Sequence, residues 1–239
     1  MKYLLIALSV IAIGCNVNIN HDRVEGNGNI RKETRNITGF KGLVVSGSFD
    51  VVLVQGDVFS IGIEADENLI EYIDVKKNDG QLEISEKDGY ELHSKSGIKL
   101  RIQMPVVENL SLSGSGTVKG ETSLTNSDAI EIDIAGSGNI TLEIKSPKVN
   151  VEIAGSGTAN LSGTTRKLRV DISGSGECMA EDLLSEDCDV SIGGSGTARV
   201  YASISLNASI GGSGDIYYRG EPKDVRKSVG GSGNVEPIK

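Results

Sequence analysis

The chain has 239 residues, of which 4% are aromatic and none is tryptophan, so small aliphatic side chains must supply most of its core. Its 24 basic and 33 acidic residues give a formal net charge of −9, which argues against nucleic acid as a partner because that binding needs a basic surface. Its 31 glycines are interleaved with valine and isoleucine, a pattern that favours short strands between tight turns over a disordered chain.

Residues 1–15, MKYLLIALSVIAIGC, have the form of an export signal, with Lys2 before an apolar run over residues 4–13. Ten helical residues cover roughly 15 Å, too little for a bilayer core of about 30 Å. The small residue before Cys15 resembles the lipobox of bacterial lipoproteins, although Ala12 stands where that pattern prefers leucine. The resemblance implies a lipoprotein signal peptide that ends at a lipidated Cys15 and holds the chain at a membrane; the alternative is an ordinary signal peptide.

Removal of the signal leaves 23 basic against 33 acidic residues, a net charge of −10. Residues 16–35 are polar and rich in Asn and Gly, which predicts a flexible tether. Residues 36–239 contain no further linker, so they predict a single domain. Within it, residues 36–110 alternate polar and apolar residues without a fixed repeat, which predicts less regular opening coils. Asp66 is placed to cap one short helix there.

Residues 111–239 carry a repeat marked by the triplet Gly-Ser-Gly. Its seven serines are spaced 18 to 22 residues apart, at positions 115, 137, 156, 175, 195, 213 and 232. Repeats of this length are typical of solenoids and arrays. We expect each triplet to form a corner, since glycine adopts backbone angles that other residues avoid.

Apolar residues keep a fixed offset from these serines. Three residues before the serine stand Leu112, Ile134, Ile153, Ile172, Ile192, Ile210 and Val229. Five before it stand Leu110, Ile132, Val151, Val170, Val190 and Ala208, and this column fails only at Lys227. The residues between them are polar, so the period is two, as in a strand with one buried face.

A strand, a glycine corner and a second strand, repeated in register, describe one coil of a parallel β-helix with coils of about 19 residues. Parallel stacking places like residues about 4.8 Å apart on successive coils. The alternative is an antiparallel β-sandwich. Antiparallel neighbours run in opposite directions, so their apolar residues need not lie at the same distance from every turn. The constant distance through seven repeats therefore favours the β-helix.

Several segments also resemble a family of bacterial envelope proteins. They are GFKGLVVSGSFDVVLVQGD at 39–57, ADENLIEYI at 65–73, NDGQLEIS at 78–85 and the Gly-Ser-Gly series. Together they resemble the putative auto-transporter adhesin, head GIN domain family over residues 36–220. The resemblance implies a right-handed β-helix on a secreted or lipid-anchored protein, and it supplies no catalytic residues.

The triplet serines lack the surroundings of a nucleophile. A hydrolase elbow needs Gly-x-Ser-x-Gly and a histidine, whereas these serines have glycine on both sides and the histidines are His21 and His93 alone. A polysaccharide-cleaving β-helix needs several converging carboxylates, and the outward columns here are mostly Ser, Thr and Asn with scattered charges. We therefore predict that the protein is not an enzyme, has no catalytic residues and needs no cofactor.

Three further sets of residues allow two interpretations each. Asp133, Glu152 and Asp171 stack on successive coils, where they either bind a cation or form a solvated face that neighbours such as Arg169 partly neutralise. Tyr201 and Tyr217 either stack on sugars or pack on the surface. Cys178 and Cys188 fall in apolar columns on different walls of the coil, which favours two buried thiols over a disulfide.

These observations predict a non-catalytic lipoprotein of the cell envelope, at the outer membrane, on its periplasmic or its surface face. It presents a rigid β-helix surface for adhesion to a glycan or an envelope protein. A structural or self-assembling envelope component, including a homo-oligomer, is the second reading. A carbohydrate-active enzyme is the third.

Overall fold

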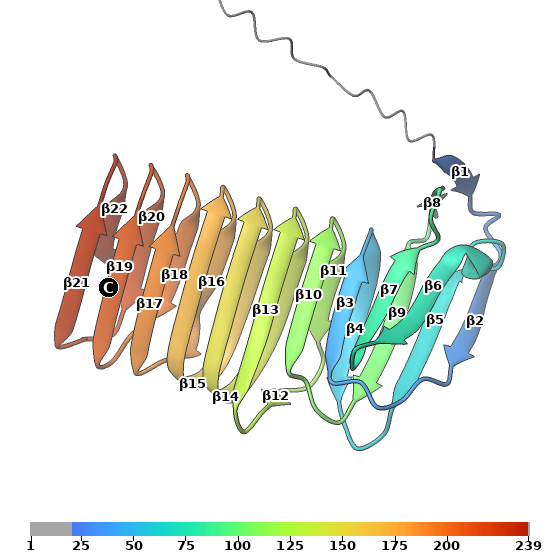
Figure 1. The fold of residues 1–239 in the computed structure, drawn as a ribbon, viewed down its shortest axis with the longest axis horizontal. Helices are drawn as coiled ribbons and strands as arrows, with labels where there is room; N and C mark the ends of the chain where they lie inside the picture. Colours follow the sequence, from blue (N-terminus) through green and yellow to red (C-terminus); the bar gives the residue numbers. More distant parts are fainter. Residues whose placement is uncertain (1–20, 239) are drawn as a thin grey trace, which may run out of the picture.

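The computed structural model describes residues 21–238, which form one elongated β-solenoid with two facing walls (Figure 1). The signal peptide and Cys15 lie outside the described residues. Wall A consists of β7 (Gln81–Glu86), β3 (Gly42–Ser46), β10 (Asn109–Gly114), β13 (Ala129–Gly136), the second halves of β14 (Asn139–Gly155) and β15 (Thr158–Gly174), β17 (Asp187–Ile192), β19 (Ser205–Ile210) and β21 (Asp224–Val229).

Wall B lies opposite and is built by the second strand of each coil. It consists of β9 (Ile98–Met104), β4 (Phe49–Gln55), β11 (Thr117–Gly120), β12 (Leu124–Thr125), the first halves of β14 and β15, β16 (Glu177–Leu184), β18 (Thr197–Tyr201), β20 (Asp215–Arg219) and β22 (Asn234–Pro237). All these strands pair in parallel within their wall. The predicted parallel β-helix is therefore confirmed, and the antiparallel sandwich is excluded for the repeats.

The stacking register follows the repeat in the sequence. Val151 pairs with Val170 and Gly155 with Gly174, so residues at one offset from the serine lie on top of one another. The predicted interior columns are buried as far as Ile210, whereas Val229 in the last coil is 44% exposed. A continuous row of aliphatic contacts thus runs through the solenoid and ends at this coil.

Each regular coil turns at two different corners. At the triplet corner Gly114, Gly136, Gly155 and Gly174 have positive φ, which confirms the predicted role of glycine. At the opposite corner β14 and β15, each 17 residues long, continue from wall B into wall A. The buried hydroxyls of Ser146 and Thr165 donate there to the carbonyl oxygens of Lys148 and Lys167, at 3.1 and 3.2 Å. These bonds give the two buried hydroxyl groups an acceptor at the bend.

The order of the first coils along the solenoid differs from their order in the sequence. Strand β3 pairs with β7 on one side and with β10 on the other, and β4 likewise lies between β9 and β11. The chain therefore first forms the β3–β4 coil, then builds outward to the N-terminal end, and returns to start the repeats on the other side.

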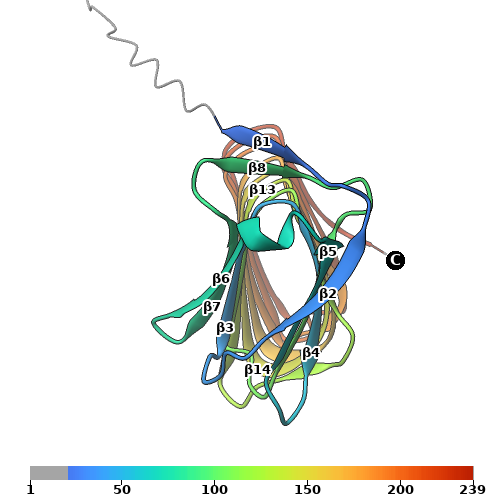
Figure 2. The same ribbon diagram turned by 90° about the vertical axis from the view of Figure 1, so that its right-hand side faces the viewer.

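Antiparallel strands close the N-terminal end of the solenoid, seen from that end in Figure 2. Strand β5 (Ser60–Asp66) pairs with β9, β2 (Ile30–Arg35) pairs with β5, and β6 (Ile73–Asn78) pairs with β7. The 3-10 turn η1 (Ile70–Tyr72) lies across the opening, and β1 (Asp22–Glu25) pairs with β8 (Tyr90–His93). We call these elements the cap. It covers the strand edges that an open end exposes.

The predicted tether of residues 16–35 differs from the structure, because its residues 22–25 and 30–35 are strands of the cap. Asp66 does not cap the helical turn, whose N-cap residue is Leu69 and has no side-chain cap bond. None of the described residues forms a helix that is long and apolar enough to cross a bilayer.

Candidate functional site

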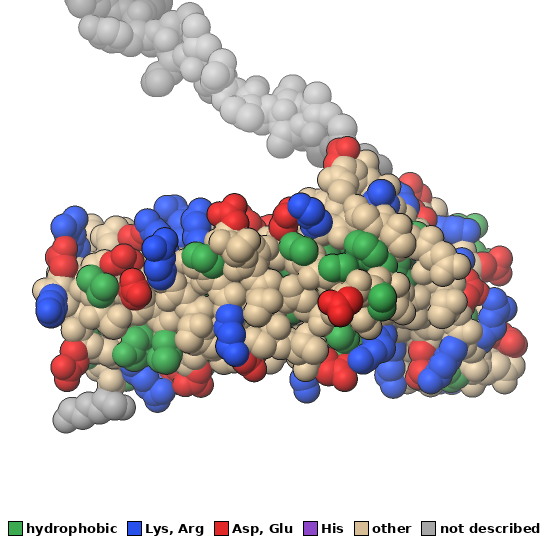
Figure 3. All heavy atoms as spheres, turned by 90° about the horizontal axis from the view of Figure 1, so that it is seen from below, with side chains coloured by type: hydrophobic (Ala, Val, Ile, Leu, Met, Phe, Trp, Pro, Cys, Tyr) green, Lys and Arg blue, Asp and Glu red, His purple; other side chains and the backbone are tan. Residues whose placement is uncertain are grey.

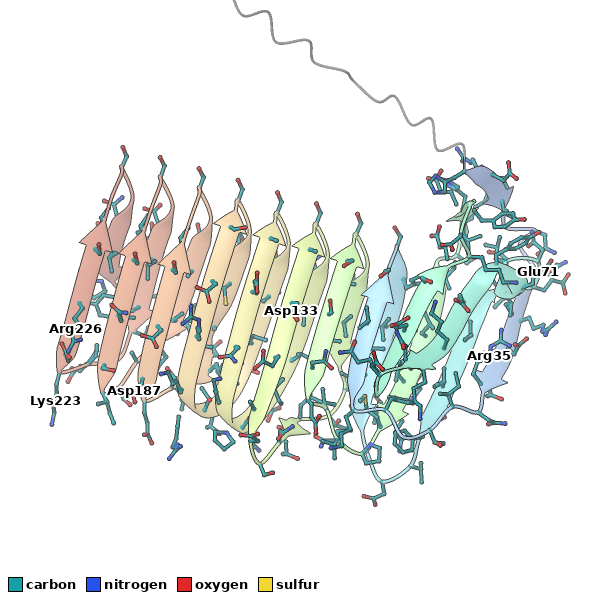
Figure 4. All side chains as sticks on the ribbon, viewed as in Figure 1. Arg35, Glu71, Asp133, Asp187, Lys223 and Arg226 are labelled. Atoms are coloured by element: carbon teal, nitrogen blue, oxygen red, sulfur yellow. The ribbon has the colours of Figure 1, made fainter. Side chains whose placement is uncertain are left out.

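The outer surface of wall A carries a polar depression across its C-terminal coils, near the residues labelled Asp187 and Arg226 in Figure 4. It consists of two adjoining hollows of about 310 and 170 Å³ that share Asp189 and Asn207. We call it the polar trough. Its outward lining residues are Arg169, Asp171, Asp189, Ser191, Ser205, Asn207, Ser209, Asp224 and Arg226.

The parallel register places these side chains in three straight columns, and Ser205 and Asp224 belong to the third. Arg169, Asp189, Asn207 and Arg226 follow one another in the first column, and Asp171, Ser191 and Ser209 follow one another in the second. Neighbours in a column lie about 4.8 Å apart, because that is the distance between paired strands. The wall therefore holds the polar groups at fixed spacings, since they stand on strands rather than on loops.

Ion pairs occupy the two ends of the trough. The guanidinium of Arg169 donates to the carboxylate of Asp171 at 2.7 and 3.3 Å, and that of Arg226 donates to Asp224 at 2.8 Å. The Lys167 ammonium lies 3.5 Å from Asp189. Between these pairs, the side chains of Ser191, Asn207 and Ser209 form no side-chain hydrogen bond with any described residue. Their hydroxyl and amide groups are thus free to bind an outside ligand.

The carboxylates of Asp133, Glu152 and Asp171 stack on successive coils as predicted, along the N-terminal continuation of the second column. Partial burial, with the neighbouring Glu152 and Glu131, raises the pKa of Asp133 above its usual value. Asp171 is neutralised by Arg169, as one of the two interpretations proposed. The described residues include no group of three or more His, Cys, Asp or Glu positioned to hold a metal ion. Asp171 lines the trough, and Asp133 and Glu152 continue its column toward the N-terminal end of the solenoid.

The two tyrosines proposed for sugar stacking lie on wall B, where both are half-buried. The Arg199 guanidinium carbon lies 5.1 Å from the ring centroid of Tyr217, and Arg199 also faces Glu181 at 3.6 Å. The ring of Tyr201 lies close to Gly220, whose added Cβ would be 3.4 Å from Cζ. Arg199 thus covers one face of the Tyr217 ring and the Tyr201 ring lies close to the backbone at Gly220, so the structure favours surface packing for both.

The thiols of Cys178 and Cys188 are free and buried, on β16 of wall B and β17 of wall A. Burial raises the pKa of the Cys178 thiol to about 12, so this thiol stays protonated and behaves as a small apolar group. The structure agrees with the prediction of two buried thiols. The triplet serines lie at exposed corners.

A wider hollow of about 710 Å³ lies at the corner opposite the triplets, lined by Ser127, Asp128, Ser146, Pro147, Thr164, Thr165, Arg166 and Glu186. The hydroxyls of Ser146 and Thr165 already donate to backbone carbonyl oxygens, so they contribute less to binding than the free groups of the trough. Figure 3 views the solenoid from this side. Acidic and basic side chains are interspersed there, and hydrophobic side chains form small separate patches.

The trough was only partly visible in the sequence. The offset from the serine predicted that Asp171, Ser191 and Ser209 face water, and the structure places them so. Six residues before the triplet serines stand Arg169, Asp189, Asn207 and Arg226. The sequence pattern alone did not combine these residues into a site. Whether such columns enclose a hollow depends on the relative lengths of neighbouring side chains.

Comparison with known proteins gives a consistent result. A family model described as putative auto-transporter adhesin, head GIN domain, matches residues 39–222. A putative adhesin from Bacteroides fragilis is 23% identical with a TM-score of 0.84, covering 90% of this chain and 100% of its own, which shows a common fold. No curated protein matches the chain.

Two solved structures are somewhat closer in sequence. A putative lipid binding protein from Parabacteroides distasonis is 28% identical with a TM-score of 0.77, and a putative adhesin from Parabacteroides merdae is 26% identical with a TM-score of 0.71. Each covers 91% of this chain and is itself covered completely. With most of its solenoid matched by the family model, the chain belongs to the family described as putative auto-transporter adhesin, head GIN domain.

Proposed function

We propose that the protein is a non-catalytic binding module of the bacterial cell envelope that attaches to a glycan or a polar protein segment through the polar trough. The family supports an adhesion-like role in general terms. The observation that carries the specific proposal is the fixed array of Ser191, Asn207 and Ser209, whose polar groups are unpaired among the described residues. Hydroxyl and amide groups both donate and accept hydrogen bonds, as the hydroxyl groups of a sugar do.

The charged groups of the trough support binding rather than hydrolysis. A glycosidase needs one carboxyl that keeps its proton and one free carboxylate across the scissile bond. Here Asp171 and Asp224 each pair with an arginine, and Asp189 faces the Lys167 ammonium. Each of these carboxylates thus already faces a cationic side chain, an arrangement that suits the recognition of polar ligands.

We further propose that a lipid on Cys15 holds the module at the outer membrane. Five residues separate Cys15 from the first described residue, a span of at most about 20 Å. The described chain begins at β1 in the cap, whereas the trough lies on β15, β17, β19 and β21 near the other end (Figure 1). An anchor at Cys15 would thus leave the trough away from the membrane, where a ligand can reach it.

The test is a binding screen of residues 16–239 against glycans and envelope proteins, followed by titration of each hit with the variant Asn207→Ala. We expect saturable binding to one ligand class and a loss of roughly threefold to tenfold in the variant, because one hydrogen bond contributes about 0.5–1.5 kcal/mol. The matched control is Asn160→Ala, since Asn160 faces outward on wall B.

Unchanged affinity in Asn207→Ala, with a loss in Asn160→Ala, would place binding on wall B and overturn the assignment. The absence of saturable binding to any ligand in the screen would overturn the adhesion proposal and favour a structural role in the envelope.

A further inference from the structure

A second depression lies on the outer surface of wall B, at the end of the solenoid that carries the cap. It is a shallow groove of about 330 Å³ that runs over β2, β5, β9 and β4. Gly62 lies at its centre, so we call it the Gly62 groove. In the row across the wall, Thr34 pairs with Gly62, Gly62 with Arg101, and Arg101 with Val52. The groove forms because this row lacks a side chain between Thr34 and Arg101.

The fold gives no reason for a glycine at position 62. Its φ is not in the left-handed region, and a Cβ added there would meet nothing nearer than the Arg101 carbonyl oxygen at 3.9 Å, an ordinary contact. The corner glycine Gly174 differs, since its added Cβ would lie 2.5 Å from the Gly155 carbonyl oxygen. Within a paired strand, glycine weakens the sheet, and its presence there is often linked to the close approach of another group.

The Gly62 groove has an apolar floor and a charged rim. Val52, the methyl of Thr34 and the aliphatic stems of Lys99 and Arg101 provide apolar surface, and its lining contains no aromatic ring. Most rim charges have a partner: the Lys32 ammonium lies 2.9 Å from Glu64, and Arg101 pairs with Glu121. The Lys99 ammonium forms no ion pair with any of the described residues. Lys32, and more weakly Lys99, lowers the pKa of Glu64, but the Glu64 carboxylate is paired with Lys32, so Lys99 is the rim cation left for an outside anion.

We propose that the Gly62 groove binds a fatty acid, with the alkyl chain lying across Gly62 and the carboxylate at the Lys99 ammonium. An alkyl chain fits a floor without aromatic rings, whereas a sugar would need aromatic faces or a dense set of hydrogen-bonding groups. The exposed charge on Lys99 complements a carboxylate. This site is separate from the polar trough, because it lies on the other wall and at the other end of the solenoid.

The proposal is tested with decanoate below its micelle concentration, titrated into residues 16–239 by calorimetry or NMR. Wild type should bind it saturably, and Gly62→Val should lose at least tenfold in affinity because the valine fills the groove. The melting temperature of Gly62→Val should stay equal or rise, since valine favours a strand more than glycine does. This variant therefore separates a lost ligand site from a lost fold.

Two further variants and one further ligand complete the test. Lys99→Gln should weaken decanoate binding several-fold, and decanol should bind wild type more weakly than decanoate because it lacks the charge. Thr141→Val is the control, since Thr141 faces outward in the same column of wall B but outside the groove. Equal binding by wild type and Gly62→Val, or the absence of saturable decanoate binding by wild type, would overturn the proposal. Neither result bears on the polar trough, whose test uses other variants.

Discussion

At the residue scale, a corner glycine meets two separate restrictions. Gly174 has φ +122°, an angle that a residue with a Cβ rarely adopts, and its added Cβ would lie 2.5 Å from the carbonyl oxygen of Gly155 in the coil below. The backbones of successive corners are also hydrogen-bonded, as in the 2.8 Å bond from the Ser175 N–H to the Gly155 carbonyl oxygen. A side chain at this position would therefore strain its own coil and push apart two paired ones.

We expect Gly174→Ala to destabilise the protein by about 3 kcal/mol, from backbone strain and contact with the coil below. For a chain of this size, that loss lowers the melting temperature by roughly 6–12 °C. Thermal unfolding followed by circular dichroism measures the effect. The matched control is Gly62→Ala, where the added methyl meets only ordinary contacts and stability should not fall. Equal losses in the two variants would show that the corner geometry is not the cause.

The sequence predicted these corners because the triplet repeats, but it could not distinguish their two forms. Positive φ occurs at the first triplet glycine of the earlier coils, such as Gly155 and Gly174. In the last three coils an additional glycine precedes the triplet, and Gly194 and Gly212 lack a positive φ. Close stacking still requires glycine there, since a Cβ on Gly194 would lie 2.3 Å from the Gly174 carbonyl oxygen. The repeat reveals the need for glycine, whereas the backbone angle differs between triplets with and without the additional glycine.

At the element scale, the cap depends on a small set of polar contacts around Asp66. Its buried carboxylate accepts the Gly28 N–H at 2.6 Å and the Ser94 hydroxyl at 2.5 Å. The Asn68 amide accepts the Asn27 N–H at 2.9 Å and donates to the Glu25 carbonyl oxygen at 2.8 Å. These bonds hold the connection between β1 and β2 against the start of η1.

We expect Asp66→Ala to release this connection, because each hydrogen bond to a charged group contributes about 1.5–3 kcal/mol and the partner groups lose their acceptor. Amide hydrogen exchange should become faster in β1 and β2, whereas the protection of β14 and β15 should stay close to that of wild type. Asp57→Ala is the control, since Asp57 is exposed and outside this network. Unchanged exchange in β2 would contradict the assigned role of Asp66.

The elements differ in how far the sequence predicts them. Coils from β10 onward follow from the apolar columns, because one face of each strand is buried and the other is wet. Strand β2, IRKETR, has only one apolar residue and no buried residue, so its sequence predicts a tether rather than a strand. Alternation also does not identify the neighbour of a strand, which is why the position of β3 between β7 and β10 could not be inferred. For the same reason the Gly62 groove could not be inferred, because it depends on the antiparallel pairing of β2 with β5 and of β5 with β9.

At the scale of the whole molecule, the two ends of the described solenoid differ. The cap covers the N-terminal end, whereas β21 is exposed at every residue and pairs only with β19. Lys227 on β21 continues the interior column of Leu110, Ile132, Val151, Val170, Val190 and Ala208. Its ammonium donates to the Val235 carbonyl oxygen at 2.7 Å and lies 5.3 Å from the ring centroid of Tyr218. The lysine side chain thus extends over the end of the apolar core from wall A to wall B.

This arrangement opposes end-to-end pairing of two copies. If β21 pairs antiparallel with β21 of a second copy and the apolar interior continues across the joint, Lys227 lies inside that joined interior. A buried charge without a partner costs several kcal/mol, and inward-pointing charges are a known means of keeping edge strands apart. The gap in the column at Lys227, visible in the sequence, therefore marks the coil at which the apolar interior stops.

We expect Lys227→Val to make the protein associate, because Val225, the new valine and Val229 would form an apolar row on a strand whose outer edge is unpaired among the described residues. The association constant should rise by about a hundredfold or more, matching removal of a penalty of several kcal/mol. Light scattering after size-exclusion chromatography, over a range of protein concentrations, measures the mass. Lys223→Val is the control, since Lys223 lies at the lower edge beside β21 (Figure 4) and its replacement changes the net charge equally. If Lys227→Val has the mass of a single chain at every concentration, or if both variants associate to the same extent, Lys227 is not the residue that prevents two copies from pairing through β21.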